Sequence, residues 1–494
     1  MLTIVSSSNI EEKQVEMLVI PVCEDADIHP AAFLPALIHQ AGNLKEFKGA
    51  ENEDVVFFAP PGARAAQVMF IGLGKKDRID AEILRKACGR AIKKCVQKEV
   101  FEAVFVVPLS EALNAEPCAT LEAMMEGACL GNYQFDQFKK PKHPSLLKIG
   151  FAVAENLVQQ ASLSANKIKI ICAGTLLARE WVTTPSNLKR PEQFSRLLVL
   201  LAEKENLRTE VLDLPALKKK KFGALLAVAA GSDANARMVV LEHDPGNTTQ
   251  TLALVGKGVT FDSGGINLKP QGSLEDMKMD MAGAAAVAAT MITAARLKLP
   301  VRLIGVLPLV ENMPSGSATR PGDIVKSFSG KTIEINNTDA EGRLILADAL
   351  SYVIQTYKPD AVVDLATLTG ACVVALGEKI AGIFSPDDRM AETLIASGLK
   401  TFERCWKMPL PEDYKDLLKS EYADICNITG SKWGGAITAA LFLSEFTENT
   451  RWVHIDIAGP AYTKKESAYC GVGGTGFGVR LLCDWIEKRV GLSF

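Results

Sequence analysis

Hydrophobic residues in the first third of the chain come in short runs that alternate with one long amphipathic stretch. The pattern over 81–97 predicts a helix, because its apolar residues recur at helical spacing. The runs rich in β-branched residues predict strands at 2–5, 17–22, 55–58, 68–73 and 103–107. This alternation favours a small α/β domain with a largely buried sheet. A helical pattern over 171–181 then leads to Pro185.

The rest of the chain repeats the rhythm on a larger scale. Strands are predicted at 252–255, 301–307, 332–335, 361–365 and 452–457, and helices at 276–296, 342–357 and 437–447. Short, fully apolar strands between helices indicate a sheet that is covered on both faces. We therefore expect an α/β fold with two domains, in which a larger C-terminal catalytic domain has a mixed, largely parallel sheet. The expected limits are 1–160 for the N-terminal domain, 161–190 for a linker helix and 191–494 for the catalytic domain.

Composition narrows the class of protein. The 494 residues are 48% hydrophobic and 23% charged, so the chain can bury large cores, and the net charge of −3 does not favour nucleic acid or an anionic membrane as a partner. No basic segment precedes an apolar run at the start, and the longest apolar stretch, 281–295, is shorter than the roughly 20 residues of a membrane span. Eleven cysteines without C-x-x-C pairs are typical of a reducing compartment. We expect a cytoplasmic protein without a membrane segment.

Acidic residues gather in two segments that follow predicted strands, where ligands of such sheets bind. The segment 256–265 reads GKGVTFDSGG, and the segment 336–343 reads NNTDAEGR. Four carboxylates at one edge of a sheet would repel one another strongly unless cations neutralised them. They are Asp262 of the first segment, Asp339 and Glu341 of the second, and Asp280, which lies where the helix after the first segment begins. Two ions of Mg²⁺, Mn²⁺ or Zn²⁺ that share bridging carboxylates are the economical arrangement, and such a pair predicts a hydrolase.

Two lysines, Lys257 and Lys269, accompany these carboxylates. A lone lysine is usually a solvated surface group, because burying its charge without a partner is costly. Beside two divalent ions, however, one lysine can ligate a metal as a neutral amine, while the other stays charged and polarises a substrate carbonyl. Their spacing leaves open which lysine has which role.

The same segments carry a family resemblance. The octapeptide 337–344 reads NTDAEGRL, and further matching segments are 364–371 (DLATLTGA), 435–439 (GAITA) and 454–459 (HIDIAG), with shorter matches at 126–128 and 131–133. Together with 256–265 and Asp280 they resemble the leucyl aminopeptidases, a cytosolic family of two-metal, hexameric peptidases. The octapeptide is that family's signature. Elsewhere, the first 120 residues match only in general layout.

The resemblance implies roles for individual residues. One metal would be held by Asp262, Asp339 and Glu341, and the other by Lys257, Asp262, Asp280 and Glu341. The ions would be Zn²⁺ or Mn²⁺, with Mg²⁺ or Co²⁺ as alternatives. Lys269 would act as an electrophile toward the tetrahedral intermediate, and Arg343 would hold a bicarbonate ion that moves a proton from the attacking water. The pocket for the substrate's first side chain would include Met277, Asn337, Thr367, Gly370 and Ala458.

The resemblance thus implies a homohexameric aminopeptidase that removes leucine and other bulky apolar residues from the N-termini of peptides. A narrower dipeptidase, such as one that cleaves cysteinyl-glycine, is the alternative among enzymes. A DNA-binding role of the N-terminal domain is the alternative from another class, although the balanced charge does not suggest it.

Three further signals are interpreted as structural. The G-x-G-x-x-G match at 471–476 leaves too little chain for a βαβ dinucleotide site. The basic run Lys218–Lys221 is typical of a solvated face, and His454 within an apolar strand is expected to be a hydrogen-bonded core residue.

Overall fold

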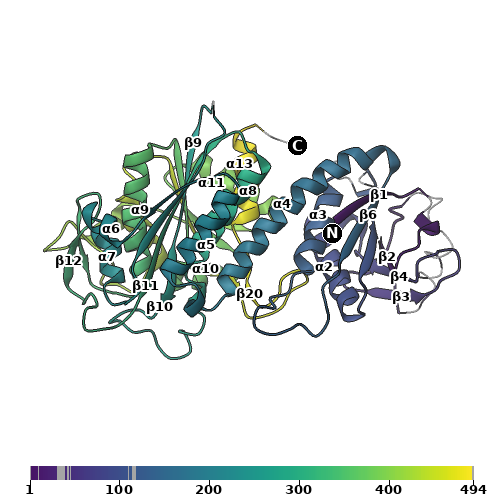
Figure 1. The fold of residues 1–494 in the computed structure, drawn as a ribbon, viewed down its shortest axis with the longest axis horizontal. Helices are drawn as coiled ribbons and strands as arrows, with labels where there is room; N and C mark the ends of the chain where they lie inside the picture. The colour runs from purple at the N-terminus through teal and green to yellow at the C-terminus, as the bar shows by residue number, and fades with distance from the viewer. Residues whose placement is uncertain are drawn as a thin grey trace. The chain divides into compact units, whose positions relative to one another are not determined.

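The computed structural model describes residues 2–8, 10–29, 39, 41, 44, 46–109, 111–113 and 118–491. The chain forms two compact units (Figure 1). The first unit is Met1–Cys172 with Lys465–Val472, and the second is Ala173–Lys464 with Gly473–Phe494. The division falls within the long helix α4 (Val158–Thr183). The domain limits expected from the sequence stay a prediction.

The first unit is built on a mostly parallel sheet. Its described strands have the order β1 (Leu2–Ser6), β6 (Lys148–Val153), β5 (Glu102–Val106), β2 (Met17–Val22), β4 (Gln67–Gly72) and β3 (Asp54–Phe58). Only β3 runs antiparallel to its neighbour. The helices α2 (Ala81–Gln97) and α3 (Ala119–Gly131) belong to the same unit. The sequence predicts five of these six strands to within one residue at each end and misses β6, and the helix over 81–97 is confirmed.

The second unit contains a larger mixed sheet. Its described strands have the order β16 (Cys405–Lys407), β15 (Ala381–Phe384), β18 (Trp452–Asp456), β14 (Ala361–Ala366), β9 (Thr251–Gly256), β11 (Arg302–Asn312), β8 (Arg237–His243) and β7 (Arg208–Leu212), and β10 (Gly258–Asp262) also pairs with β11. The strands β18, β14, β9, β11 and β10 are joined by parallel pairs. The carboxyl ends of these central strands therefore face one edge of the sheet, where a ligand site is expected.

Helices cover both faces of this sheet, as the sequence predicts. Figure 1 shows α8 (Ala282–Leu297) on one side of β9 and β11 and α9 (Glu341–Tyr357) on the other. Ala253 of β9 shares a buried cluster with Leu350 of α9, whereas a Cβ added to Gly305 of β11 would lie 2.8 Å from Met291 of α8. The other helices of this unit are α5 (Pro191–Lys204), α6 (Leu214–Lys219), α7 (Gly223–Ala229), α10 (Gly370–Leu376), α11 (Asp388–Thr401), α12 (Gly435–Ser444) and α13 (Val479–Arg489).

Several predicted elements differ from the structure. The strand expected over 301–307 runs on to Asn312 as β11, and the helix expected over 171–181 already begins at Val158 as α4. The strand over 332–335 exists as β13 (Thr332–Ile335), but it lies in a separate small sheet between β12 (Asp323–Lys326) and β17 (Ile425–Cys426). The acidic loop after β13 therefore does not leave the edge of the main sheet. The helix expected over 276–296 is broken into a short 3₁₀ turn, Met277–Met279, followed by α8. The helix expected over 437–447 is α12, which begins two residues earlier because Gly434 takes up a left-handed conformation with φ 67°.

Of the three signals interpreted as structural, His454 is confirmed as a hydrogen-bonded core residue. His454 is fully buried, and its Nδ1 lies 2.6 Å from Oδ1 of Asp364. Lys218–Lys221 are exposed at the end of α6. Gly473–Gly474 form the short strand β20, which pairs antiparallel with β19 (Tyr462–Thr463) instead of opening a βαβ unit. None of the helices formed by the described residues combines the length and apolar character needed to cross a lipid bilayer.

Candidate metal centre

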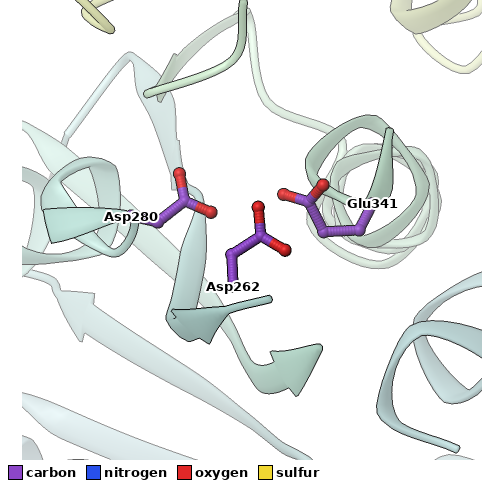
Figure 2. A group of neighbouring side chains, drawn as sticks. All are labelled: Asp262, Asp280 and Glu341. Atoms are coloured by element: carbon purple, nitrogen blue, oxygen red, sulfur yellow. The ribbon is translucent and has the colours of Figure 1, made fainter. Parts of the chain in front are cut away.

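Three carboxylates converge in the second unit. Asp262 is the last residue of β10, Asp280 follows the 3₁₀ turn, and Glu341 is the first residue of α9. Figure 2 shows the three side chains pointing toward one another from these separate elements. One carboxylate oxygen from each lies within 4.8 Å of the others, and all three residues are buried. The structure thus brings together three of the four carboxylates proposed as metal ligands.

The turn after β10 depends on glycine. Gly264 and Gly265 have φ angles of +88° and +66°, which residues with a Cβ rarely adopt. A Cβ at Gly264 would also come within 2.4 Å of the carbonyl oxygen of Asn267. The two glycines let the chain turn sharply after Asp262, so that the next residues run back past its carboxylate to Lys269.

Lys257, the residue between β9 and β10, bridges two of the carboxylates. Its Nζ lies 2.7 Å from Oδ1 of Asp280 and 2.7 Å from Oε1 of Glu341. It also donates to the carbonyl oxygen of Thr367 at 2.8 Å. Its side chain is only 3% exposed, so this lysine is not the solvated surface group of the alternative interpretation.

Lys269 bridges the other pair. Its Nζ lies 2.8 Å from Oδ2 of Asp262 and 2.6 Å from Oδ1 of Asp339. The side chain of Asp339 is 32% exposed, in contrast to those of the three converging carboxylates. Each lysine therefore contacts its own two carboxylates, and two ammonium groups balance only two of the four negative charges.

The local charge imbalance is reflected in the pKa values. Burial, followed by repulsion from Glu341, raises the pKa of Asp262 to about 6. Burial also raises the pKa of Asp280 well above its ordinary value. Burial alone would lower the pKa of Lys257, but attraction to Asp280 and Glu341 raises it overall. The ionised forms of Asp262 and Asp280 are thus disfavoured until further positive charge is supplied. Burial alone would also raise the pKa of Glu341, but attraction to Lys257 and Lys269 lowers it overall.

Hydrogen bonds from neighbouring residues orient two of the carboxylates. Nδ2 of Asn312 donates to Oδ1 of Asp262 at 2.8 Å, and the backbone N–H of Gly264 donates to the same oxygen at 2.9 Å. Oγ1 of Thr367 donates to Oδ1 of Asp280 at 2.7 Å. Asn312 was not predicted as a site residue. It lies at the end of β11 beside Asp262 at the end of β10, so knowledge of the pairing of these two strands would have pointed to it.

The residues proposed for the substrate pocket lie on segments around these carboxylates. Met277 is in the 3₁₀ turn before Asp280, Gly370 begins α10, and Ala458 follows β18. Oδ1 of Asn337 accepts a hydrogen bond from the backbone N–H of Asp339 at 2.8 Å. The sequence analysis did not identify what joins the segments that carry Gly370 and Ala458.

Asp456 joins those two segments. Its Oδ1 accepts the N–H groups of Leu368 at 3.2 Å and Ala458 at 3.1 Å, and its Oδ2 accepts the hydroxyl of Thr369 at 2.6 Å. Thr369 in turn caps α10 by accepting the N–H of Cys372 at 3.0 Å. A single buried carboxylate thus fixes the loops after β14 and β18 relative to each other.

Arg343 is buried in the first turn of α9. Its Nη1 donates to the carbonyl oxygen of Asn427 at 2.7 Å, and burial lowers its pKa to about 10. Its Nε is buried and has no hydrogen-bond partner among the described residues. A buried guanidinium with an unused donor suits a small anion.

The donor set fits divalent cations. Oδ2 of Asp280 is buried and accepts no hydrogen bond from any described residue. Oε1 of Glu341 is close to Lys257, but not in a hydrogen-bonding geometry. Buried carboxylate oxygens without donors are costly, and hard or borderline metal ions satisfy them.

Comparisons with known proteins decide the family. A model described as "Cytosol aminopeptidase family, catalytic domain" matches residues 176–483. A second, described as "Cytosol aminopeptidase family, N-terminal domain", matches residues 19–142. The chain belongs to the cytosol aminopeptidase family. The resemblance seen in the sequence and the two-domain α/β fold are therefore confirmed.

Relatives in this family match over nearly the whole chain. A probable cytosol aminopeptidase of Syntrophotalea carbinolica is 45% identical over 463 residues, which is 92% of each chain. One of Chlorobium phaeobacteroides is 39% identical over 98% of this chain and 99% of its own. The solved structure of the bottromycin maturation enzyme BotP in complex with Mn has a TM-score of 0.86 at 34% identity and covers 96% of this chain and 100% of its own. As a member of the cytosol aminopeptidase family, the protein is a metal-dependent aminopeptidase.

Proposed function

We propose that this aminopeptidase uses two divalent ions to remove leucine and other bulky apolar residues from the N-termini of peptides. The observation that carries the proposal is the buried convergence of Asp262, Asp280 and Glu341, with an oxygen of Asp280 that no described residue satisfies. The Mn in the related BotP structure supports Mn²⁺ as one of the ions this site accepts, with Zn²⁺ as the other leading choice.

The proposed ligand sets share two carboxylates. Asp262, Asp339 and Glu341 would hold one ion, and Lys257, Asp262, Asp280 and Glu341 would hold the other. The contacts of each lysine support a division between them, since Lys257 is almost fully buried and faces Asp280 and Glu341. When bound, such ions supply a Lewis acid for the scissile carbonyl and make a water molecule acidic enough to attack near neutral pH.

Lys269 is the side chain proposed to act as an electrophile toward the carbonyl oxygen of the substrate. Attraction to Asp262 and Glu341 outweighs the effect of burial and raises its pKa, so the group stays an ammonium ion at neutral pH. Once Asp262 and Asp339 are engaged as ligands, this positive charge is available to stabilise the negative charge that develops on the carbonyl oxygen.

Arg343 is proposed to hold a bicarbonate ion that accepts a proton from the attacking water. Its buried, unpartnered Nε supports an anion at this point. The pocket for the first side chain would be formed by Met277, Asn337, Thr367, Gly370 and Ala458. A homohexamer is part of the same proposal.

The proposal also explains cleavage at the first residue only. The four carboxylates of the centre are all committed as ligands, so none of them remains to bind a charged ammonium group. The substrate's α-amine must therefore bind to a metal ion as an uncharged ligand, and metal ions compete with protons for such a basic group.

Metal counting tests the proposal. Purified protein is expected to hold two divalent ions per chain and to hydrolyse leucyl amide, with activity lost on chelation and restored by Mn²⁺ or Zn²⁺. Full activity after the metal has been removed, or one ion per chain at saturation, would contradict it.

A further inference from the structure

Asn427 lies directly after β17 and is fully buried beside the loop that carries Asp339 and Glu341. The short strand β17 pairs in parallel with β13, and the backbone N–H of Asn427 donates to the carbonyl oxygen of Glu334 at 2.9 Å. This register fixes Asn427 opposite the point where the chain leaves β13. Its side chain therefore faces the acidic loop from a segment more than eighty residues away in the sequence.

The side-chain amide of Asn427 forms hydrogen bonds with backbone groups of the loop after β13, which has no neighbouring strand to pair with among the described residues. Its Oδ1 accepts the backbone N–H groups of Asn336 at 2.9 Å and Asn337 at 3.3 Å. Its Nδ2 donates to the carbonyl oxygens of Asn337 at 2.7 Å and Ala340 at 3.5 Å. An asparagine amide has two acceptor and two donor positions, and all four are used on one loop.

The backbone of Asn427 holds a second part of the centre. Its carbonyl oxygen accepts the hydrogen bond from Nη1 of Arg343. One residue thus contacts both the turn that precedes Glu341 and the guanidinium of Arg343, two residues after it. Among the described residues, no hydrogen bond joins Asn427 to any of the four carboxylates, so an influence on them must pass through the loop.

We propose that Asn427 is a positioning residue that sets the affinity of the centre for its metal ions by fixing the loop 336–340. The proposal rests on the function proposed above. Asn427 donates to the carbonyl oxygen of Ala340, which lies between the proposed ligands Asp339 and Glu341. Loss of the amide would therefore free the backbone that sets the distance between these two ligands. Loss of a supporting partner of a metal ligand typically costs about 10–100-fold in metal affinity or activity.

The test compares Asn427→Ala, Asn427→Asp and the wild type by competition for Mn²⁺ with a chromogenic chelator, together with thermal unfolding of the metal-free proteins. Asn427→Asp keeps the side-chain shape and the acceptors for Asn336 and Asn337, but it loses the donors. We expect the Kd for Mn²⁺ to rise about 10–100-fold in Asn427→Ala and measurably in Asn427→Asp. With Mn²⁺ at saturation, kcat on leucyl amide is expected to fall more than KM rises.

Ser420→Ala is the matched control. Ser420 donates a hydrogen bond to the side chain of Glu334 in β13, but it forms no hydrogen bond with the loop 336–340 among the described residues. It is expected to bind Mn²⁺ as the wild type does. Wild-type affinity in Asn427→Ala, or an equal loss in Ser420→Ala, would overturn the proposal. If Asn427→Ala does not fold, Asn427→Asp decides alone, and wild-type affinity there would overturn it. A wild-type protein that binds neither Mn²⁺ nor Zn²⁺ would instead refute the proposed function itself.

Discussion

Gly342 lies against the side chain of Lys257. A Cβ added to Gly342 would come within 2.6 Å of Cε and 2.8 Å of Nζ of Lys257. The second residue of α9 must therefore lack a side chain, so that the lysine can reach across the helix start to Glu341 and Asp280. Gly342, the glycine of the signature octapeptide, thus leaves room for the side chain of Lys257.

This contact predicts that Gly342→Ala folds but binds metal poorly. The atoms that a methyl group would displace belong to the end of a flexible side chain, which can move aside. Metal titration should show a weakened site, with thermal unfolding of the metal-free protein close to that of the wild type. Metal affinity equal to the wild type would contradict the role given to Lys257.

Gly283→Ala is the contrasting control. A Cβ there would lie 2.0 Å from the backbone carbonyl oxygen of Leu365, which cannot move without disturbing β14. We expect it to destabilise the fold by about 1–3 kcal/mol or more, as overpacked cores do.

Glu341→Ala should abolish activity without unfolding the protein. Glu341 is proposed to bridge both ions, and its removal also relieves the repulsion that, after burial, is the second cause of the raised pKa of Asp262. We expect kcat/KM on leucyl amide to fall by more than about 100-fold, beyond the loss typical of an outer partner. Metal content per chain and circular dichroism are the companion measurements. The exposed Glu392→Ala on α11 is the control, and wild-type turnover and metal content in Glu341→Ala would refute the assignment.

Lys269→Ala and Lys257→Ala should differ in kind. Lys269→Ala is expected to keep its metal ions and to lose about 10²–10³-fold in kcat, the usual cost of one lost contact to a developing oxyanion. Lys257→Ala is expected to lose metal. Elemental analysis and steady-state kinetics on both variants separate the roles, and the opposite pattern would show that the two lysines have been exchanged.

Asp348 predicts a pH dependence of stability that is independent of the metal centre. Its Oδ2 accepts the N–H of Leu225 at 2.9 Å and its Oδ1 that of Phe328 at 2.7 Å. Burial raises its pKa to about 7. The folded protein therefore keeps a proton on Asp348 that the unfolded chain releases near pH 4. The associated stability is complete below about pH 4 and is lost as the pH rises to about 7.

The variant Asp348→Asn isolates this effect. The free energy of unfolding of the wild type minus that of the variant should decrease between about pH 4.5 and 7.5 and then stay constant. Urea titrations of the metal-free proteins across this range measure it. A difference that grows with pH, or does not change, would show that Asp348 is ionised in the folded state.

The sequence predicts the two-domain α/β class and the strands that carry clear hydrophobic runs, but it misses β6 in the first unit and β7, β8, β10, β15 and β16 in the main sheet of the second. It does not reveal that β13 leaves the main sheet, since four alternating residues fit an edge of either sheet equally well. It also places the helix start before Asp280, whereas α8 begins after it.

The candidate carboxylates follow from strand ends and from the octapeptide, but their supports do not. Asn312 and Asn427 act through hydrogen bonds between segments far apart in the chain. Neither side chain has a local signal, because an asparagine after a strand is equally typical of a turn. Only the pairing of β10 with β11, and of β13 with β17, brings them to the loops they hold.

The proposed function requires both the metal ions and a free α-amine on the substrate. The most direct measurement compares kcat/KM for Leu-Gly and N-acetyl-Leu-Gly between about pH 6 and 10, across the α-amino pKa, with Mn²⁺-loaded and metal-stripped protein. We expect cleavage of Leu-Gly only, only by the loaded protein, and faster toward alkaline pH. Comparable rates on both peptides, or activity that survives removal of the metal, would contradict the account.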